Sequence, residues 1–292
     1  MPATMHNMIA AALVAGVLAL TTLPARSAEI ATADDTARFL AGLSPTPGSP
    51  LAALSKDPFW RLHARNFDSM FGREESTSLS KVRAFSREHL TDKHDTMFYM
   101  FSGPDFLYAT SFFPGASTYV LAGLEPVGDV PQLNILSHGA IEETLQNLER
   151  SLGTILSYSF FITRNMRTQL SSGPAHGTVP ILYVFLARTG KTIHDVSFVS
   201  LDEEGNLQSL SEPGGKGIGK NAPRIAASSA AKGVKIVFSD GNGPSQTLYY
   251  FSTNLGDDGV RKSGFLAFCA KLGPADSFIK SASYLLHNGG FN

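Results

Sequence analysis

Three polar residues of types that could do chemistry lie at the ends of two apolar runs. In the stretch MFYMFSGPDFLYATSFFPGASTYVLAGLEP, Ser102 and Asp105 follow the first run and Glu125 ends the second. If the two runs are neighbouring parallel strands, these side chains meet at the sheet edge where open α/β sheets bind ligands. Two carboxylates and a hydroxyl can hold hydroxyl groups, an amine or a metal ion, or can act as acid and base. The alternative is that Asp105 only caps a helix and that Glu125 with Pro126 only ends a strand.

The segments that position these residues read as strand, helix and strand. TMFYMFS is a short apolar run that ends at Gly103-Pro104, which is typical of a buried strand. PDFLYATSFFPG opens with a proline, which is allowed in the first turn of a helix, and closes with Pro-Gly. STYVLAGLEP is again apolar and stops at Pro126. The order predicts a Rossmann-like βαβ unit with parallel strands and a right-handed connection.

The remaining segments continue the alternation of helices and strands. Amphipathic spacing predicts a long helix in GAIEETLQNLERSLGTILSYSFF, and GTVPILYVFLARTG predicts a buried helix. KTIHDVSFVSLDEEGN predicts a strand, and VKIVFSDGNGPSQTLYYFSTNL predicts a β-hairpin. SGFLAFCAKLG and ADSFIKSASYLLHNGG predict two short helices at the end. The fold predicted for 96–292 is a three-layer α/β domain with a mixed sheet, preceded over 28–95 by a mostly helical N-terminal part.

Composition and the N-terminus limit the compartment and the partners. The 292 residues carry Lys+Arg 24 against Asp+Glu 25, a net charge of -1, so nucleic acid is not expected as a partner. The apolar run from Met8 to Leu20, followed by small residues, predicts a signal peptide over 1–27 that is cleaved after Ser27. The chain is therefore expected to be exported, periplasmic or secreted, without a stable membrane span after cleavage. Its one cysteine, Cys269, cannot form an internal disulfide and is expected to be a buried thiol.

Other motifs of known chemistry are incomplete. GGKGIGKN, from Gly214, lacks the Ser or Thr that ends a phosphate-binding loop. Ser277 and Lys280 in SFIK have the S-x-x-K spacing of penicillin-binding enzymes, but the motifs occur in the reverse order here. There is no H-x-x-x-H pair and no G-x-S-x-G turn. No cofactor and no metal are therefore expected.

Four stretches resemble motifs of an uncharacterised family of exported bacterial proteins: FSGPDFLYATSFFP, YVLAGLEPVGDVP, YYFSTNL and KSASYLLH. The resemblance covers roughly residues 50–292 and implies no known activity and no catalytic residues. Relatives continue beyond the KSASYLLH segment, which implies that this chain is shortened at its C-terminus. The β-α-β order also resembles, loosely, the first half of a Rossmann-like methyltransferase, but FSGPDF lacks the G-x-G that a cofactor needs, and topology alone does not imply function.

Taken together, the sequence predicts an exported α/β protein that binds a small or polymeric ligand at the C-terminal sheet edge through Ser102, Asp105 and Glu125. One alternative is an envelope or extracellular hydrolase that uses Asp105 and Glu125 as acid and base. The other is a structural envelope-interaction protein.

Overall fold

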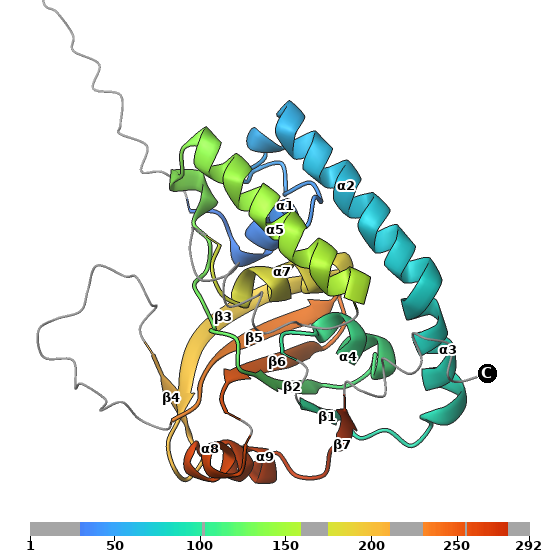
Figure 1. The fold of residues 1–292 in the computed structure, drawn as a ribbon, viewed down its shortest axis with the longest axis vertical. Coiled ribbons are helices and arrows are strands. Elements are labelled where there is room, and N and C mark those ends of the chain that lie inside the picture. The colour runs from blue at the N-terminus through green and yellow to red at the C-terminus, as the bar shows by residue number, and fades with distance from the viewer. Residues whose placement is uncertain (1–29, 101–102, 159–174, 211–229, 255, 280–292) are drawn as a thin grey trace, which may run out of the picture.

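A mixed β-sheet forms the centre of the molecule (Figure 1). The computed structural model describes residues 30–100, 103–158, 175–210, 230–254 and 256–279, and all structural statements below concern these residues. Within them the sheet has seven strands in the order β4-β3-β5-β6-β2-β1-β7. The strands are β1 (Thr96–Met100), β2 (Thr118–Gly123), β3 (Lys191–Leu201), β4 (Leu207–Ser209), β5 (Lys232–Asp240), β6 (Ser245–Ser252) and β7 (Asp276–Ile279).

The two halves of the sheet differ in strand direction. The pairs β6-β2, β2-β1 and β1-β7 are parallel, whereas the pairs β4-β3, β3-β5 and β5-β6 are antiparallel. β1 and β2 are joined through helix α4 (Phe106–Phe112) and pair from Thr96↔Thr118 onward. The predicted strand-helix-strand unit and the β5-β6 hairpin are thereby confirmed.

Helices cover both faces of the sheet. α1 (Ala33–Leu40), α2 (Pro58–Glu74), α3 (Ser80–His89), α4, α5 (His138–Tyr158) and α7 (Val179–Arg188) lie on one face, and α8 (Asp257–Lys262) and α9 (Phe265–Lys271) on the other (Figure 1). Side chains of β2 point alternately to the two faces of the sheet and contribute to both cores. Tyr119 and Leu121 belong to the larger hydrophobic cluster, and Val120 and Ala122 belong to the smaller one. The mixed α/β fold is as predicted.

The N-terminal helices pack onto the same core as the sheet. A short 3₁₀ turn (Leu54–Lys56) precedes α2, which begins at Pro58, a residue favoured in the first turn of a helix. A π-helical turn, η2 (Glu75–Leu79), connects α2 to α3. One continuous cluster joins the apolar side chains of α1 and α2 to those of α7 and the sheet. Trp60 anchors this packing, because its buried ring donates a hydrogen bond from Nε1 to the backbone oxygen of Phe39 at 3.1 Å.

The first residues of the last predicted helix form a strand instead. Asp276–Ile279 forms strand β7, which pairs in parallel with β1 from Met97↔Asp276. The edge of β1 offers unpaired backbone groups, and pairing with them outweighs the local helical pattern. Ser277 is consequently on a strand and not at a helix start, so the S-x-x-K mechanism has no structural basis here.

Several predicted features lie outside the described residues: the signal peptide over 1–27, the glycine-rich loop from Gly214, and the chain after Ile279. Among the helices that are described, none is long and apolar enough to cross a membrane.

Candidate functional site

The carboxyl edge of the parallel strands holds Asp105. Asp105 is the N-cap of α4, is 4% exposed, and accepts a hydrogen bond at Oδ1 from the backbone N–H of Tyr108 at 3.4 Å. The chain reaches this position through Gly103, whose φ of 60° suits glycine and whose N–H donates to the backbone oxygen of Ala122 at 3.2 Å. Asp105 therefore has the capping role that was the alternative to a site role. Ser102 lies outside the described residues.

Glu125 lies at the same edge, after β2, and is 2% exposed. The hydroxyl of Tyr250 donates to the backbone oxygen of Glu125 at 2.8 Å and lies 3.4 Å from its Oε2. A Cβ added to Gly123 would lie 2.3 Å from Oε2 of Glu125 and 2.7 Å from Cα of Gly103. The two glycines thus let the backbones after β1 and β2 touch, with the carboxylate folded back beside them.

The structure therefore brings Asp105 and Glu125 to one edge, as predicted, but buries both. Burial, with a further contribution from the charge of Glu125, raises the pKa of Tyr250 well above its usual value, so Tyr250 stays a protonated donor. A site open to solvent at this edge must involve another group.

That group is Glu74, which the sequence reasoning missed. Glu74 ends α2, is 5% exposed, and accepts a hydrogen bond at Oε1 from the hydroxyl of Tyr108 at 2.6 Å. Burial, followed by the charge of Glu74 and the hydrogen bond to it, raises the pKa of Tyr108, which keeps the hydroxyl protonated as a donor. Tyr108 thereby contacts two carboxylates, Asp105 through its backbone and Glu74 through its ring.

Glu74 also lines a pocket between α2 and α5. The pocket has a volume of about 560 Å³ and is lined by Asn66, Ser69, Met70, Arg73, Glu74 and Thr77 from α2 and η2, and by Gly153 and Leu156 from α5. A Cβ added to Gly153 would lie 3.9 Å from Cε of Met70, an ordinary contact, so the pocket has space beside this residue. The volume is in the range of small-molecule sites, about 300–1,000 Å³.

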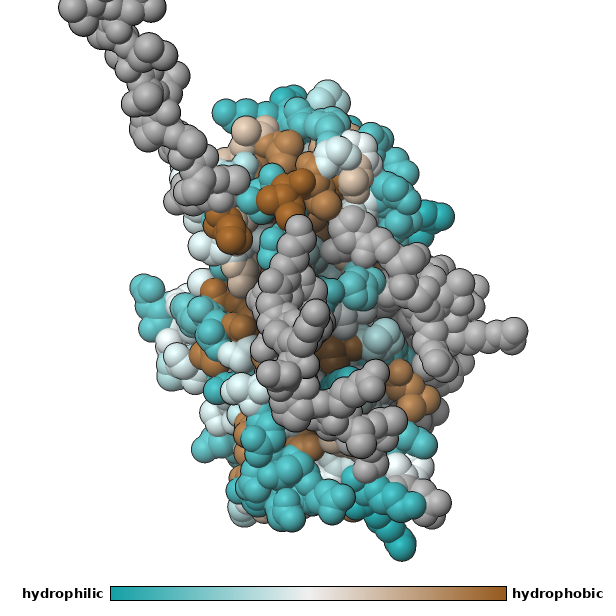
Figure 2. Space-filling model, turned by 90° about the vertical axis from the view of Figure 1, so that its left-hand side faces the viewer, coloured by the Kyte–Doolittle hydropathy of each residue, from teal (hydrophilic) through white to brown (hydrophobic). Residues whose placement is uncertain are grey.

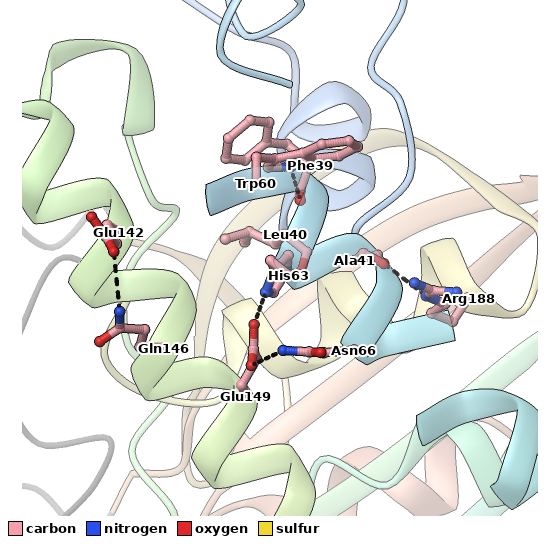
Figure 3. Close-up of polar contacts among 10 residues, drawn as sticks. All are labelled: Phe39, Leu40, Ala41, Trp60, His63, Asn66, Glu142, Gln146, Glu149 and Arg188. Atoms are coloured by element: carbon pink, nitrogen blue, oxygen red, sulfur yellow. Dashed lines mark hydrogen bonds and ion pairs between the residues drawn. The ribbon is translucent and has the colours of Figure 1, made fainter. Parts of the chain in front are cut away.

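A polar clamp fixes the two helices beside the pocket (Figure 3). Glu149 of α5 accepts hydrogen bonds from His63 Nδ1 at 2.8 Å and from Asn66 Nδ2 at 3.0 Å. The other ring nitrogen of His63, Nε2, lies 2.8 Å from the backbone oxygen of Leu40 in α1. Near the start of both helices, His138 contacts Asp57 at 2.8 Å. The clamp sets the α2–α5 spacing from which the pocket results.

The sequence does contain a signal for Glu74. Phe67, Phe71, Glu74 and Ser78 follow one another at spacings of 4, 3 and 4 residues, which places a glutamate on the apolar face of a helix. All four are buried. The π-helical turn begins directly after Glu74, and such turns are frequent at functional sites.

Two other pockets carry only surface charge. One, of about 300 Å³, contains His194 and Asp195 of β3, and one, of about 510 Å³, contains the turn Asp202–Glu204 and Lys262. None of these charged side chains is buried, in contrast to Glu74. Among the described residues no group of three or more His, Cys, Asp or Glu side chains could hold a metal ion.

On one face of the molecule, the visible described residues form no single dominant apolar area (Figure 2). Figure 2 shows the face at the left of Figure 1, where brown areas are separated by polar ones. Exposed large apolar side chains include Ile30, Leu124, Ile135 and Leu266. Scattered residues of this kind are normal on soluble surfaces, so they identify no partner.

Comparison of the chain with protein-family models, curated proteins and solved structures finds no match.

Proposed function

We propose that this chain is an exported ligand-binding protein. Its ligand is a small polar molecule that binds in the pocket between α2 and α5, within the helices that cover the carboxyl ends of the parallel strands. One observation carries the proposal: Glu74 is a buried carboxylate that lines an open pocket, and only its Oε1 has a partner among the described residues. Oε2 is not one of the buried side-chain atoms that lack a partner, so it can be reached from the pocket, where a donor group of a ligand would replace solvent beside it.

Two further points support the proposal. Asp105 and Glu125 lie at the edge where the Rossmann-like strand-helix-strand order places ligand sites, and Tyr108 joins this edge to the pocket. Export, to the periplasm or to the medium, rests on the signal-peptide pattern over 1–27. Mass measurement of the exported protein tests it, and a chain that begins after Ser27 is the expected result.

The hydrolase alternative has no observation in its favour. Asp105 caps α4 and Glu125 is held beside Gly123, and neither carboxylate lines the pocket. A purely structural role also has no observation in its favour, because it does not explain why a buried carboxylate lines a pocket.

The experiment is a thermal-shift screen with small polar compounds in four charge classes: neutral sugars, amines, carboxylates and zwitterions. Gly153→Trp fills the pocket, and Gly153→Ala is its matched control because the site has space for a Cβ. A ligand at roughly 100 times its Kd stabilises the folded protein by about 2.7 kcal/mol. We expect a compound that raises the unfolding midpoint of the wild type and of Gly153→Ala but not that of Gly153→Trp. If no compound does so, or if the tryptophan variant responds equally, the pocket is not the binding site.

A further inference from the structure

We infer that the ligand of the α2–α5 pocket is zwitterionic, with an ammonium group on Glu74 and an anionic group on Arg73, in the size class of an amino acid or a short peptide. This inference rests on the proposed function and specifies its ligand class.

The carboxylate of Glu74 favours a positively charged group of the ligand. Tyr108 donates to Oε1 of Glu74, while Oε2 has no hydrogen bond among the described residues. None of their Lys, Arg or His side chains forms an ion pair with Glu74 either. Because Tyr108 keeps its proton, it donates a hydrogen bond without neutralising the carboxylate. An ammonium group supplies both the missing charge and donors for Oε2.

The pocket walls add further hydrogen-bond acceptors. Asn66 uses its amide nitrogen on Glu149 at 3.0 Å, which leaves its carbonyl oxygen as an acceptor. Thr77 donates its hydroxyl proton to the backbone oxygen of Arg73 at 2.9 Å and lies 3.3 Å from Oγ of Ser78, which leaves a lone pair of Thr77 Oγ1 as an acceptor. Two neutral acceptors that line the same pocket as a carboxylate favour a ligand end that carries several N–H donors.

Arg73 places the opposite charge at the exposed side of the same pocket. Its side chain is exposed and lines the pocket next to Glu74, and no ion pair holds it among the described residues. The guanidinium group suits a carboxylate, because two N–H donors match its two oxygens. A pure cation would be repelled by Arg73, and a pure anion by Glu74. A neutral sugar would leave both charges uncompensated.

The test is calorimetric titration of the full chain with the dipeptide alanyl-alanine, its N-acetylated form and its C-terminal amide. We expect the free dipeptide to bind, acetylation to weaken binding by about 10- to 100-fold, and amidation to weaken it by about 10-fold. Glu74→Gln should weaken binding of the free dipeptide as much as acetylation does. It should barely change binding of the acetylated form, because the two changes remove the same contact.

Matched controls lie on the same helical segment. Glu75→Gln removes a neighbouring exposed carboxylate that pairs with Arg83 outside the pocket, and Arg65→Gln removes an exposed arginine of α2 that does not line it. Both should bind the dipeptide like the wild type, whereas Arg73→Gln should discriminate less between the dipeptide and its amide. Glutamine keeps an acceptor oxygen for Tyr108, and the acetylated probe needs no variant, so a folding defect cannot hide the result.

The outcomes separate this inference from the proposed function. If acetylation leaves the affinity unchanged, the ligand class is wrong but the pocket remains the proposed binding site. The same conclusion follows if the dipeptide does not bind and neutral sugars do, provided that Gly153→Trp blocks the binding of the sugars. If no charge class binds, both are overturned.

Discussion

The polar clamp between α2 and α5 allows us to predict both the sign and the magnitude of the change in stability when Glu149 is replaced. Both ring nitrogens of His63 face oxygen acceptors at 2.8 Å, Glu149 Oε1 and the backbone oxygen of Leu40, so only the doubly protonated ring can donate to both. His63 is 2% exposed and the Glu149 side chain 23%. Replacing Glu149 with Ala removes the acceptor that faces Nδ1 of the buried His63 and the acceptor of the Asn66 amide.

The magnitude follows from the contacts that are lost. Hydrogen bonds to charged groups contribute about 1.5–3 kcal/mol when buried, and partial exposure of Glu149 reduces this value. Loss of the His63 bond, with a smaller part from Asn66, gives about 2–3 kcal/mol for Glu149→Ala. At about 2–4 °C per kcal/mol for a chain of this size, the unfolding midpoint should fall by about 4–12 °C.

The assay is thermal and urea unfolding at neutral pH, with Glu142→Ala as the matched control. Glu142 lies on the same helix, and within the described part of the chain its carboxylate accepts only one exposed hydrogen bond, from Gln146 at 3.3 Å (Figure 3). The control should change the free energy of unfolding by less than about 0.5 kcal/mol. If Glu149→Ala is no more destabilising than Glu142→Ala, the clamp does not hold the helices together and the reasoning above fails.

Three further predictions follow from single contacts. Burial raises the pKa of Glu149, but the hydrogen bonds from His63 and Asn66 outweigh it, and the net pKa lies below the usual 4.5. The stabilisation that ionised Glu149 gives should therefore be present above pH 4.5 and be lost as the pH falls below it. Unfolding curves measured between about pH 3 and pH 6 should show that the free energies of unfolding of the wild type and of Glu149→Gln converge at the acid end. Gly123→Ala should lower the free energy of unfolding by about 1–3 kcal/mol, because its Cβ would meet Cα of Gly103 at 2.7 Å. The control Gly115→Ala should be close to neutral, because its Cβ would meet nothing within 4 Å. Equal urea midpoints for the two variants would contradict this prediction. Burial raises the pKa of the Cys269 thiol to about 12, so a thiol reagent at about pH 8 should label the native protein slowly and the unfolded protein fast, and rapid native labelling would count against the placement of Cys269.

The local elements could be predicted because their patterns are local. Ile141, Leu145, Leu148 and Leu152 repeat at helical spacing and are buried in α5 as expected. The β5-β6 hairpin follows from two β-rich runs joined by a glycine-containing turn. The edge that holds Asp105 and Glu125 follows from the strand-helix-strand order.

What the tertiary structure decided depends on contacts between distant segments. Glu74 meets Tyr108 across 34 residues, and His63 meets Glu149 across 86, and neither pairing is encoded in a local pattern. β7 is a strand because the edge of β1 is beside it, although its own segment reads as helical. Apart from β7, the sequence by itself determined the type of the main elements and the sheet edge at which polar residues gather. Only packing decided that Asp105 and Glu125 are buried and that Glu74 faces the pocket, because burial depends on which helices cover the edge.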